Sequence, residues 1–310
     1  MSKPAPACYR TMNWPSYNAS LKRRGDLLVW FDPDMEWLAS SRSKPGRPTI
    51  FSDTAIQFCL TIKSLFGLPL RQTTGFVESL LRLAGLDWRV PDFSTLSRRQ
   101  PPLNVQVPLQ SRRGCLHLLV DSTGIKMMGE GEWKVKKHGA EYRRQWRKLH
   151  FGVDAQSGEI CALEVTDNHT NDASVVPILL SQIPEERTIS SVTGDGAYDT
   201  RNCHEAIAQR GAKAVIPTRR NASFWRPDKP GYEARNETLR AVKRLGRTIW
   251  KKWSGYHRRS LSETKMHCFK LLADKVKSKS LQSQITELRI CATILNRFTE
   301  IGTPQTVRVS

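Results

Sequence analysis

Short β-rich runs alternate with helical stretches over the middle of this 310-residue chain, and this alternation limits the possible folds more than any other feature. Three β-rich runs come first, and a short turn containing Gly158 joins the last two into a predicted hairpin. A helix, a strand, a helix and a strand are predicted to follow. The predicted strands cover residues 116–120, 148–153, 160–165, 188–193 and 214–216, and the predicted helices cover residues 172–183 and 200–210.

The order of these elements predicts the fold class. An antiparallel meander followed by helix, strand, helix and strand is the order of the ribonuclease-H-like fold, so we expect an α/β domain with a mixed sheet flanked by helices. Prolines at 101, 102 and 108 separate this region from a helical one. We therefore expect a small helical domain with an extended arm in residues 1–110, the ribonuclease-H-like domain in residues 111–300 and a tail in residues 301–310.

Helical patterns precede the proline break. A helix capped by Ser52 or Asp53 is predicted first, a second helix covers residues 70–83, and a short third helix carries Arg98 and Arg99. Helix, turn, helix with a basic final helix is the arrangement that enters a DNA major groove. A plain helical bundle would show the same pattern, so both interpretations stay open.

The first forty or so residues mix proline, tryptophan and charged residues without a clear period, so we expect an extended or partly ordered arm. Residues 44–48 follow, and their prolines hold the backbone extended and present Arg47 in a shape able to lie in a minor groove. A short proline and glycine linker would look the same, and the sequence does not decide between the two.

The excess of basic residues indicates a polyanionic partner. Lys and Arg number 49 against 29 Asp and Glu, and the formal net charge of +20 is spread through the chain. Nucleic acid is the commonest such partner because binding to phosphates releases condensed counterions, although basic residues that only maintain solubility are the alternative. No hydrophobic run approaches the roughly 20 residues of a membrane span. We therefore expect no membrane partner. The seven scattered cysteines include no CxxC pair, so we also expect a cytoplasmic protein with reduced thiols and no zinc site.

Two aspartates stand where predicted strands end. Asp121 follows the run at residues 116–120 and precedes a predicted loop rich in glycine and lysine, and Asp195 follows the strand at residues 188–193. The carboxyl ends of strands in α/β sheets face the crevice where ligands bind, and small neighbours leave space for a metal and a phosphate. Either aspartate taken alone is more typical of a cap on the following turn.

A third group of polar side chains is predicted on a helix over residues 256–270. At about 100° per residue, four of them fall within roughly 60° of one another. These four are Tyr256, Arg259, Glu263 and Lys270. The opposite face, which we expect to be buried, carries Leu261, Cys268 and Leu272. A surface helix with a solvated charge stripe would show the same geometry, so the spacing alone does not establish catalysis.

The same segment resembles the Y-R-E-K signature of bacterial insertion-sequence DDE transposases. It has a tyrosine, two residues, an arginine, three residues, a glutamate, six residues and a lysine. Residues 120–124, 129–134, 195–199 and 253–263 also resemble motifs of the insertion sequence five group. The resemblance runs from about Cys115 to Arg297 and, more loosely, through residues 46–99.

This resemblance implies a transposase that cuts DNA at the ends of an insertion sequence and joins the 3′ hydroxyl ends to target DNA. By similarity, Asp121, Asp195 and Glu263 are the carboxylates that bind Mg²⁺, with Mn²⁺ as a substitute, and hard oxygen ligands suit these ions. The residues implied at phosphates are Tyr256, Arg259 and Lys270. The implied partners are double-stranded DNA, at inverted-repeat ends and at the target, and further copies of the chain. A catalytically silent repressor and a structure-selective nuclease are the alternatives.

A basic stretch beside Asp121 is a candidate clamp for the DNA backbone, although an exposed basic hairpin without a fixed partner would look the same. Its basic side chains are Lys134, Lys136, Lys137, His138, Arg143, Arg144, Arg147 and Lys148. Trp225, in a loop, is a candidate platform for an unpaired base. Trp250 and Trp253 have helical spacing and are more typical of a core.

Overall fold

The computed structural model describes residues 8–32, 34–40, 48–107, 114–127 and 146–309. The chain divides into two compact units. Unit 1 comprises Met1–Leu96 with Ile294–Ser310, and unit 2 comprises Ser97–Thr293. Among the described residues, no helix is both long enough and apolar enough to cross a membrane.

Unit 1 is mainly helical, and its longer helices confirm the predicted ones. The hydroxyl of Ser52 accepts a hydrogen bond from the Ala55 N–H and caps α2, which ends where Gly67 adopts a left-handed backbone with φ 66°. The elements are β1 (Cys8–Thr11), α1 (Trp14–Arg24), η1 (Leu27–Val29), α2 (Asp53–Phe66), α3 (Leu70–Leu83), α4 (Phe93–Arg99), which continues into unit 2, and β8 (Thr306–Val309).

The beginning of the chain differs from the predicted extended arm, because residues 14–24 form α1. Pro15 lies in its first turn, where a missing N–H breaks no helical hydrogen bond. The guanidinium of Arg24 donates to the carbonyl oxygens of Gly302 at 2.7 Å and Phe298 at 3.3 Å. β1 pairs antiparallel with β8, so the predicted tail also contains a strand. The prediction of an extended or partly ordered arm did not include this helix or this strand pairing, because contacts between the two ends of the chain leave no local period in the sequence.

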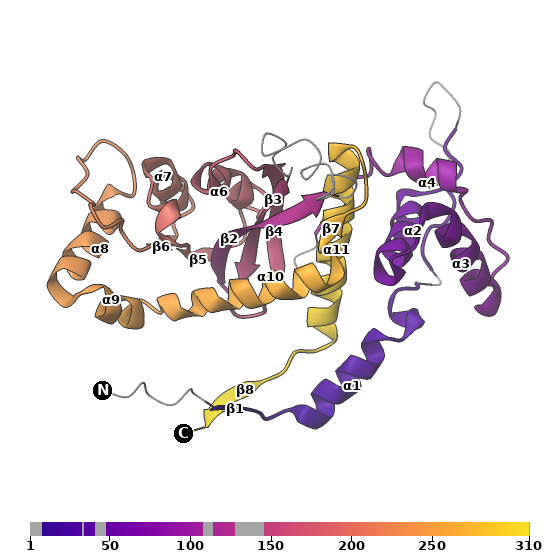
Figure 1. The fold of residues 1–310 in the computed structure, drawn as a ribbon, viewed down its shortest axis with the longest axis horizontal. Coiled ribbons are helices and arrows are strands. Elements are labelled where there is room, and N and C mark those ends of the chain that lie inside the picture. Colours follow the sequence, from indigo (N-terminus) through magenta and orange to yellow (C-terminus); the bar gives the residue numbers. More distant parts are fainter. Residues whose placement is uncertain (1–7, 33, 41–47, 108–113, 128–145, 310) are drawn as a thin grey trace, which may run out of the picture. The chain divides into compact units, whose positions relative to one another are not determined.

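A six-stranded mixed sheet forms the centre of unit 2 (Figure 1). Its strand order is β4-β3-β2-β5-β6, and β7 also pairs with β2. β2, β3 and β4 form the expected antiparallel meander, whereas β5, β6 and β7 each run parallel to the strand they join. With helices on its faces, this sheet confirms the ribonuclease-H-like fold. The strands are β2 (Leu116–Met127), β3 (Trp146–Asp154), β4 (Ile160–Asp167), β5 (Ile189–Thr193), β6 (Lys213–Val215) and β7 (Lys275–Val276).

β2 is longer than the predicted strand, which ended before Asp121. It continues to Met127 because β3 pairs with it as far as Lys126, and β7 pairs with its last two residues. Asp121 therefore lies within β2, opposite Phe151, and the prediction that it follows the strand was wrong. Pairing along this segment outweighs the loop preference of its glycine and lysine.

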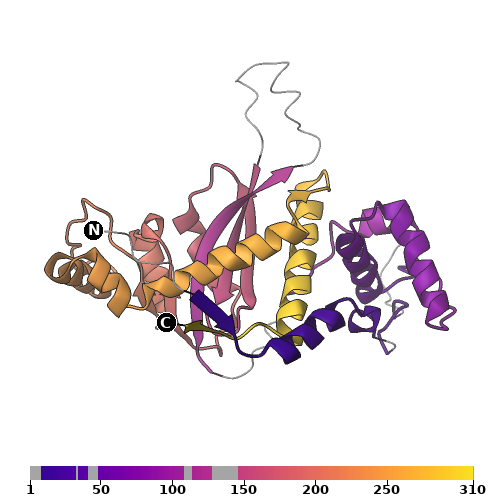
Figure 2. The ribbon, with the colours of Figure 1, turned by 60° about the horizontal axis from the view of Figure 1, so that its bottom comes forward.

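Helices cover both faces of this sheet (Figure 2). α6 (Asp172–Ser181) and α7 (Arg201–Gln209) pack on one face, over the buried side chains of Leu118, Val120 and Val192. α10 (Ser260–Leu272) crosses the other face, where the rings of Phe269 and Phe151 meet at a centroid distance of 5.1 Å. A side chain of β2 that points away from the α6 and α7 face therefore points toward α10.

The remaining helical elements of unit 2 flank these layers. Trp250 is buried as predicted, whereas Trp253 is 71% exposed, so the core prediction was wrong for Trp253. It is the last residue of its helix, and its ring lies at the surface with the Lys213 ammonium 5.7 Å away. These elements are η2 (Gly196–Tyr198), α8 (Tyr232–Leu245), α9 (Arg247–Trp253), η3 (Tyr256–Arg259) and α11 (Leu281–Ile301), which continues into unit 1.

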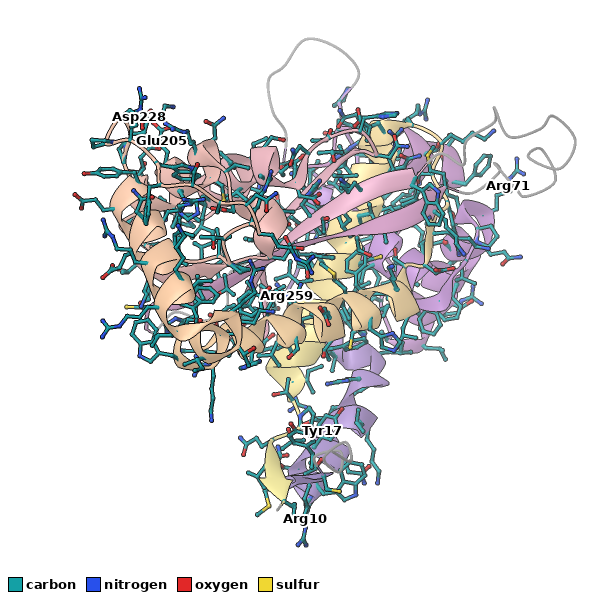
Figure 3. All side chains as sticks on the ribbon, turned by 60° about the vertical axis from the view of Figure 1, so that its left-hand side comes forward. Arg10, Tyr17, Arg71, Glu205, Asp228 and Arg259 are labelled. Atoms are coloured by element: carbon teal, nitrogen blue, oxygen red, sulfur yellow. The ribbon has the colours of Figure 1, made fainter. Side chains whose placement is uncertain are left out.

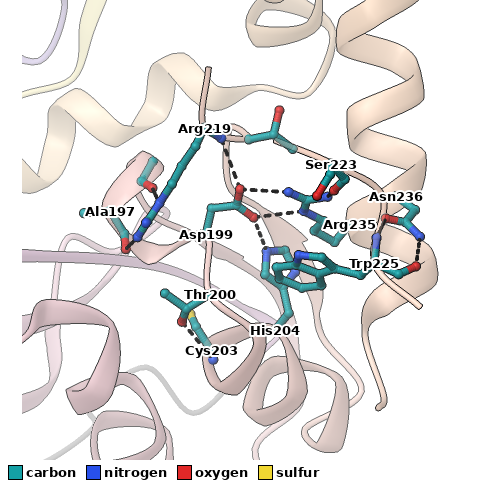
Figure 4. Close-up of polar contacts among 12 residues, drawn as sticks. Ala197, Asp199, Thr200, Cys203, His204, Arg219, Ser223, Trp225, Arg235 and Asn236 are labelled. Atoms are coloured by element: carbon teal, nitrogen blue, oxygen red, sulfur yellow. Dashed lines mark hydrogen bonds and ion pairs between the residues drawn. The ribbon is translucent and has the colours of Figure 1, made fainter. Parts of the chain in front are cut away.

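A buried ion cluster fixes the segment between β6 and α8 to the turn that follows β5 (Figure 4). Asp199 accepts hydrogen bonds from Arg235, at 3.2 and 3.3 Å, and from the backbone N–H of Arg219 at 3.1 Å. His204 Nε2 lies 3.4 Å from Asp199 Oδ1, and Trp225 packs 4.3 Å from the Arg235 guanidinium. The side chains of Asp199 and Arg235 are only 2% and 3% exposed, so each charge depends on the other for compensation.

The cluster also sets the pKa of its carboxylate. Burial by itself raises the pKa of Asp199, but the contacts from His204, Arg235 and the Arg219 N–H outweigh it and hold the pKa at about 2. A carboxylate whose pKa is lowered on folding contributes stability above its ordinary pKa of 3.8. That contribution is lost as the pH falls through the lowered value.

Replacing Asp199 by Asn leaves the Arg235 charge buried without a counter-charge. We expect Asp199→Asn to lower the free energy of unfolding by about 3 kcal/mol at neutral pH, measured by urea unfolding. The difference in free energy of unfolding between the unchanged protein and Asp199→Asn should become smaller as the pH falls from about 4 to about 2, because the Asp199 carboxylate becomes protonated over this range. Asp228→Asn, which removes the exposed partner of Arg201, is the control and should lower stability by less than about 1 kcal/mol. A difference in free energy of unfolding that stays constant over this pH range would contradict the lowered pKa of Asp199.

Candidate active site

The pairing of β2 with β5 brings Asp121 and Asp195 together. The parallel ladder ends at the pair Leu119 and Thr193, and each aspartate lies two residues further along the chain. Because side chains alternate between faces with a period of two, both aspartates point to the face of the sheet that α10 covers. Their proximity is evident in the electrostatics, since the charge of Asp195 raises the pKa of Asp121.

The turn after β5 depends on close packing. A Cβ atom on Gly194 would lie 2.9 Å from the ring of Tyr198 and 3.1 Å from the side chain of Val120, so glycine is required there. Asp195 Oδ1 accepts a hydrogen bond from the Ala197 N–H at 2.8 Å and caps η2. The turn-capping role that was the alternative for this aspartate is therefore present, and it holds the carboxylate at the end of β5.

α10 carries the third acidic residue over β2. Glu263 is 56% exposed, on the side of the helix away from the core. The predicted buried face was wrong, because Leu261 and Cys268 are exposed. The side chains of α10 that are buried instead are Ser262, Met266 and Phe269. The surface beneath the helix is part polar and part apolar, so the face that fits it combines a hydroxyl with large apolar groups.

The guanidinium of Arg259 joins two of the acidic residues. Its Nη1 lies 2.8 Å from Asp121 Oδ2, and its Nη2 forms an ion pair with Glu263 Oε1, one helical turn away. Ser262 Oγ lies within hydrogen-bond distance of the same Asp121 oxygen, at 3.0 Å, and of the Arg259 carbonyl oxygen, at 2.7 Å, so its single hydrogen is shared between these two acceptors. Figure 3 labels Arg259 at the start of α10, beside the strands. The side chains of Arg259 and Asp121 are 23% and 15% exposed, so the pair is partly withdrawn from water.

All three acidic residues act on this guanidinium. Burial lowers the pKa of Arg259, but the surrounding negative groups, led by Asp121 and including Glu263 and Asp195, raise it above its ordinary value. Burial raises the pKa of Asp121 and outweighs its hydrogen bonds and the charge of Arg259, which lower it. Arg259 thus pairs directly with a carboxylate of β2 and one of α10, and the charge of Asp195 acts on it without an ion pair.

The three carboxylates have the ligand chemistry of a Mg²⁺ or Mn²⁺ site, since hard oxygen ligands suit these ions. Within the described part of the chain, no three acidic, histidine or cysteine side chains lie close enough together to hold a metal ion. Arg259 lies between Asp121 and Glu263 and supplies the positive charge in this arrangement. The residues fit a divalent cation by their chemistry, and binding by all three carboxylates requires the guanidinium to move.

Tyr256 and Lys270, which the sequence predicts at phosphates, lie on the same helical segment. Tyr256 is half-buried with its ring 6.0 Å from that of Trp250, and burial raises the pKa of its hydroxyl. Lys270 is half-buried on α10, about two turns after Glu263. Tyr256 precedes Glu263 in η3, and Lys270 follows it on α10 at the same separation along the chain.

The other predicted DNA contacts have different surroundings. Arg147 donates to Gln284 at 2.8 Å and Lys148 pairs with Asp172 at 3.0 Å, whereas Trp225 belongs to the Asp199 cluster. Arg98 and Arg99 lie at the end of α4. Seven predicted residues lie outside the described part of the chain, and their roles stay predictions: Arg47, Lys134, Lys136, Lys137, His138, Arg143 and Arg144.

Sequence reasoning missed two features of this region. Ser262 is fully buried on Asp121, and its spacing of four and seven residues from Met266 and Phe269 is a signal that could have identified the buried face. The pairing of Asp199 with Arg235 left no signal, because a buried ion pair between distant segments has no local pattern.

Two protein-family models match this chain. One, described as a transposase DDE domain, matches residues 113–297, which is more than half of the chain and includes Asp121, Asp195 and Glu263. The other carries the same description and matches residues 22–130. Together with the ribonuclease-H-like sheet, these matches establish that the chain belongs to the family of transposases with a DDE domain.

Proposed function

We propose that this transposase cuts DNA at the ends of an insertion sequence and joins the released 3′ hydroxyl groups to target DNA. The observation that carries the proposal is that Arg259 pairs with both Asp121 and Glu263, while Asp195 lies just past the end of β5, the strand that pairs with β2. Grouped like charges oppose folding, so their grouping from three distant segments indicates a functional requirement.

Asp121, Asp195 and Glu263 are proposed to hold two divalent metal ions, Mg²⁺ with Mn²⁺ as a substitute. When bound, such ions activate the attacking oxygen and stabilise the leaving oxygen of an in-line displacement. Ser262 keeps the carboxylate of Asp121 in one orientation through its hydrogen bond. The same site serves both reactions, with water as the nucleophile in cleavage and the 3′ hydroxyl as the nucleophile in joining.

Three further residues are proposed to position the DNA end. Arg259 offers a planar fork that matches a phosphate, and Lys270 supplies a point charge further along α10. Tyr256 stands before them, at the start of η3. Phosphate contacts of this kind fix the register of the DNA strand without reading its sequence.

Side chains near the aspartates are not proposed as nucleophiles. The Tyr198 hydroxyl belongs to a side chain that is only 2% exposed, and burial raises its pKa far above the ordinary range, so a phenolate does not form there. The backbone N–H of Ser122 donates to Asp121 Oδ1 at 2.9 Å and helps to hold this carboxylate. Direct attack by water and by DNA needs no covalent protein intermediate.

The proposed partners are double-stranded DNA and further copies of the chain. The net charge of +20 favours a polyanion, and two element ends have to be held together during insertion. The helices of residues 53–99, with Arg98 and Arg99, are proposed to recognise the element ends, and the basic stretch at residues 134–148 is proposed to clamp the DNA backbone.

Removing one carboxylate tests the proposed reaction. Asp121→Asn, Asp195→Asn and Glu263→Gln should each abolish metal-dependent cleavage and strand transfer of oligonucleotides that carry the DNA flanking the gene. DNA binding, measured by mobility shift, should remain because none of these changes removes a positive charge. Asp274→Asn, in an exposed position just beyond α10, should behave like the unchanged protein.

The outcomes separate the possible functions. Full activity of the Asp195→Asn variant would refute the proposed ligand set. Cleavage without joining in the unchanged protein would indicate a nuclease, and DNA binding without either reaction would indicate a repressor.

The hydroxyl of Ser262 offers a second test, because it touches Asp121 and no DNA contact is proposed for it. Ser262→Ala should weaken Mn²⁺ binding in the presence of duplex DNA by roughly 10- to 100-fold, measured by titration calorimetry. Ser260→Ala, an exposed change on the same helix, is the matched control and should leave the affinity unchanged. Equal affinities for the Ser262→Ala variant and the unchanged protein would show that this hydrogen bond does not organise the site.

A further inference from the structure

The guanidinium of Arg259 lies between two of the carboxylates that are proposed to bind metal. It bridges Asp121 of β2 and Glu263 of α10, and the charge of Asp195 also raises its pKa. We propose that Arg259 is a substitute cation that neutralises the carboxylates in the absence of DNA, and that DNA opens the metal site by drawing this guanidinium to a phosphate. This inference rests on the proposed function, because it assumes that the three carboxylates bind metal.

The pairing of Arg259 with Asp121 and the binding of a metal ion to Asp121 compete for the same carboxylate oxygen. Asp121 Oδ2 already accepts from Arg259 at 2.8 Å and from Ser262 at 3.0 Å, so its lone pairs are engaged. A metal ion that used this oxygen would meet the positive charge of the guanidinium at close range. Like charges at such a distance repel strongly in a site partly withdrawn from water. Metal binding by all three carboxylates and the present position of Arg259 therefore oppose each other.

The exposure of Arg259 allows it to leave. Its side chain is 23% exposed and its partner Glu263 is 56% exposed, whereas the structural Arg235 is 3% exposed. Arg259 makes two ion pairs, and a phosphate offers the same planar, bidentate arrangement of oxygen atoms. A phosphate can therefore replace the two carboxylates as the partner of Arg259 with hydrogen bonds of the same kind.

Coupling between DNA and metal follows from this exchange. DNA that holds Arg259 at a phosphate leaves three carboxylates without a cation, and this raises their affinity for a divalent ion. Because coupling between two ligands is reciprocal, metal must raise the affinity for DNA by the same factor. The transposase would then complete its metal site only where a substrate is present.

Mn²⁺ binding to the full-length protein tests the inference. Free Mn²⁺ is measured by electron paramagnetic resonance in a titration with and without a short DNA duplex. For the unchanged protein, the duplex should raise the Mn²⁺ affinity by roughly 5- to 150-fold, the usual range of coupling between two sites. Arg259→Gln, which removes the charge, should bind Mn²⁺ more tightly than the unchanged protein without DNA, and the duplex should add little. Arg258→Gln, an exposed neighbouring change, should behave like the unchanged protein.

Two further variants make each outcome decisive. Asp121→Asn should lose Mn²⁺ binding in every condition, and Arg259→Lys, which keeps the charge and loses the fork, should fall between Arg259→Gln and the unchanged protein. If Asp121→Asn weakens Mn²⁺ binding while Arg259→Gln and Arg259→Lys match the unchanged protein with and without duplex, the substitute-cation role is wrong and the metal site stands. If Asp121→Asn has no effect in any condition, the proposed function itself fails.

Discussion

The register between β2 and β5 is the constraint on which the rest of the site depends. Apolar side chains of both strands, such as Leu118 and Val192, fill the core beneath α6 and α7, so the alternate positions must face α10. A slip of one residue would turn Asp121 into that core and expose apolar side chains in its place. The packing that stabilises the sheet therefore also fixes which face carries the two aspartates.

Charge balance is the second requirement, and the protein meets it differently at two neighbouring places. Asp199 is paired with Arg235, and both side chains are almost fully buried, so this ion pair has a structural role. Asp121 is paired with Arg259 closer to solvent, in a group of three carboxylates that exceeds the charge of one guanidinium. A buried ion pair with no net charge has a structural role. A partly exposed group of side chains with a net negative charge is suited to binding further cations. This difference in burial separates the structural ion pair from the candidate active site.

Much of the architecture could be predicted from the sequence, because it depends on local signals. The cap at Ser52, the stop at Gly67 and the alternation of strands and helices after residue 114 each act over a few residues. Features that depend on distant partners could not be predicted in this way. β2 continues past Asp121 because β3 and β7 pair with it, and the face that α10 buries is decided by the surface beneath it. The three acidic residues could be named from their motifs, but the role of Ser262 and the bridge through Arg259 required the structure.

We expect DNA, metal and Arg259 to rearrange around Asp121, Asp195 and Glu263. The most direct measurement is the structure of the protein bound to a DNA end with Mn²⁺, with the metal located by its anomalous scattering. We expect anomalous peaks beside the oxygens of Asp121, Asp195 and Glu263, with the Arg259 guanidinium on a phosphate. Mn²⁺ bound elsewhere, or bound at these residues while Arg259 still pairs with Asp121, would contradict the proposed role of these residues.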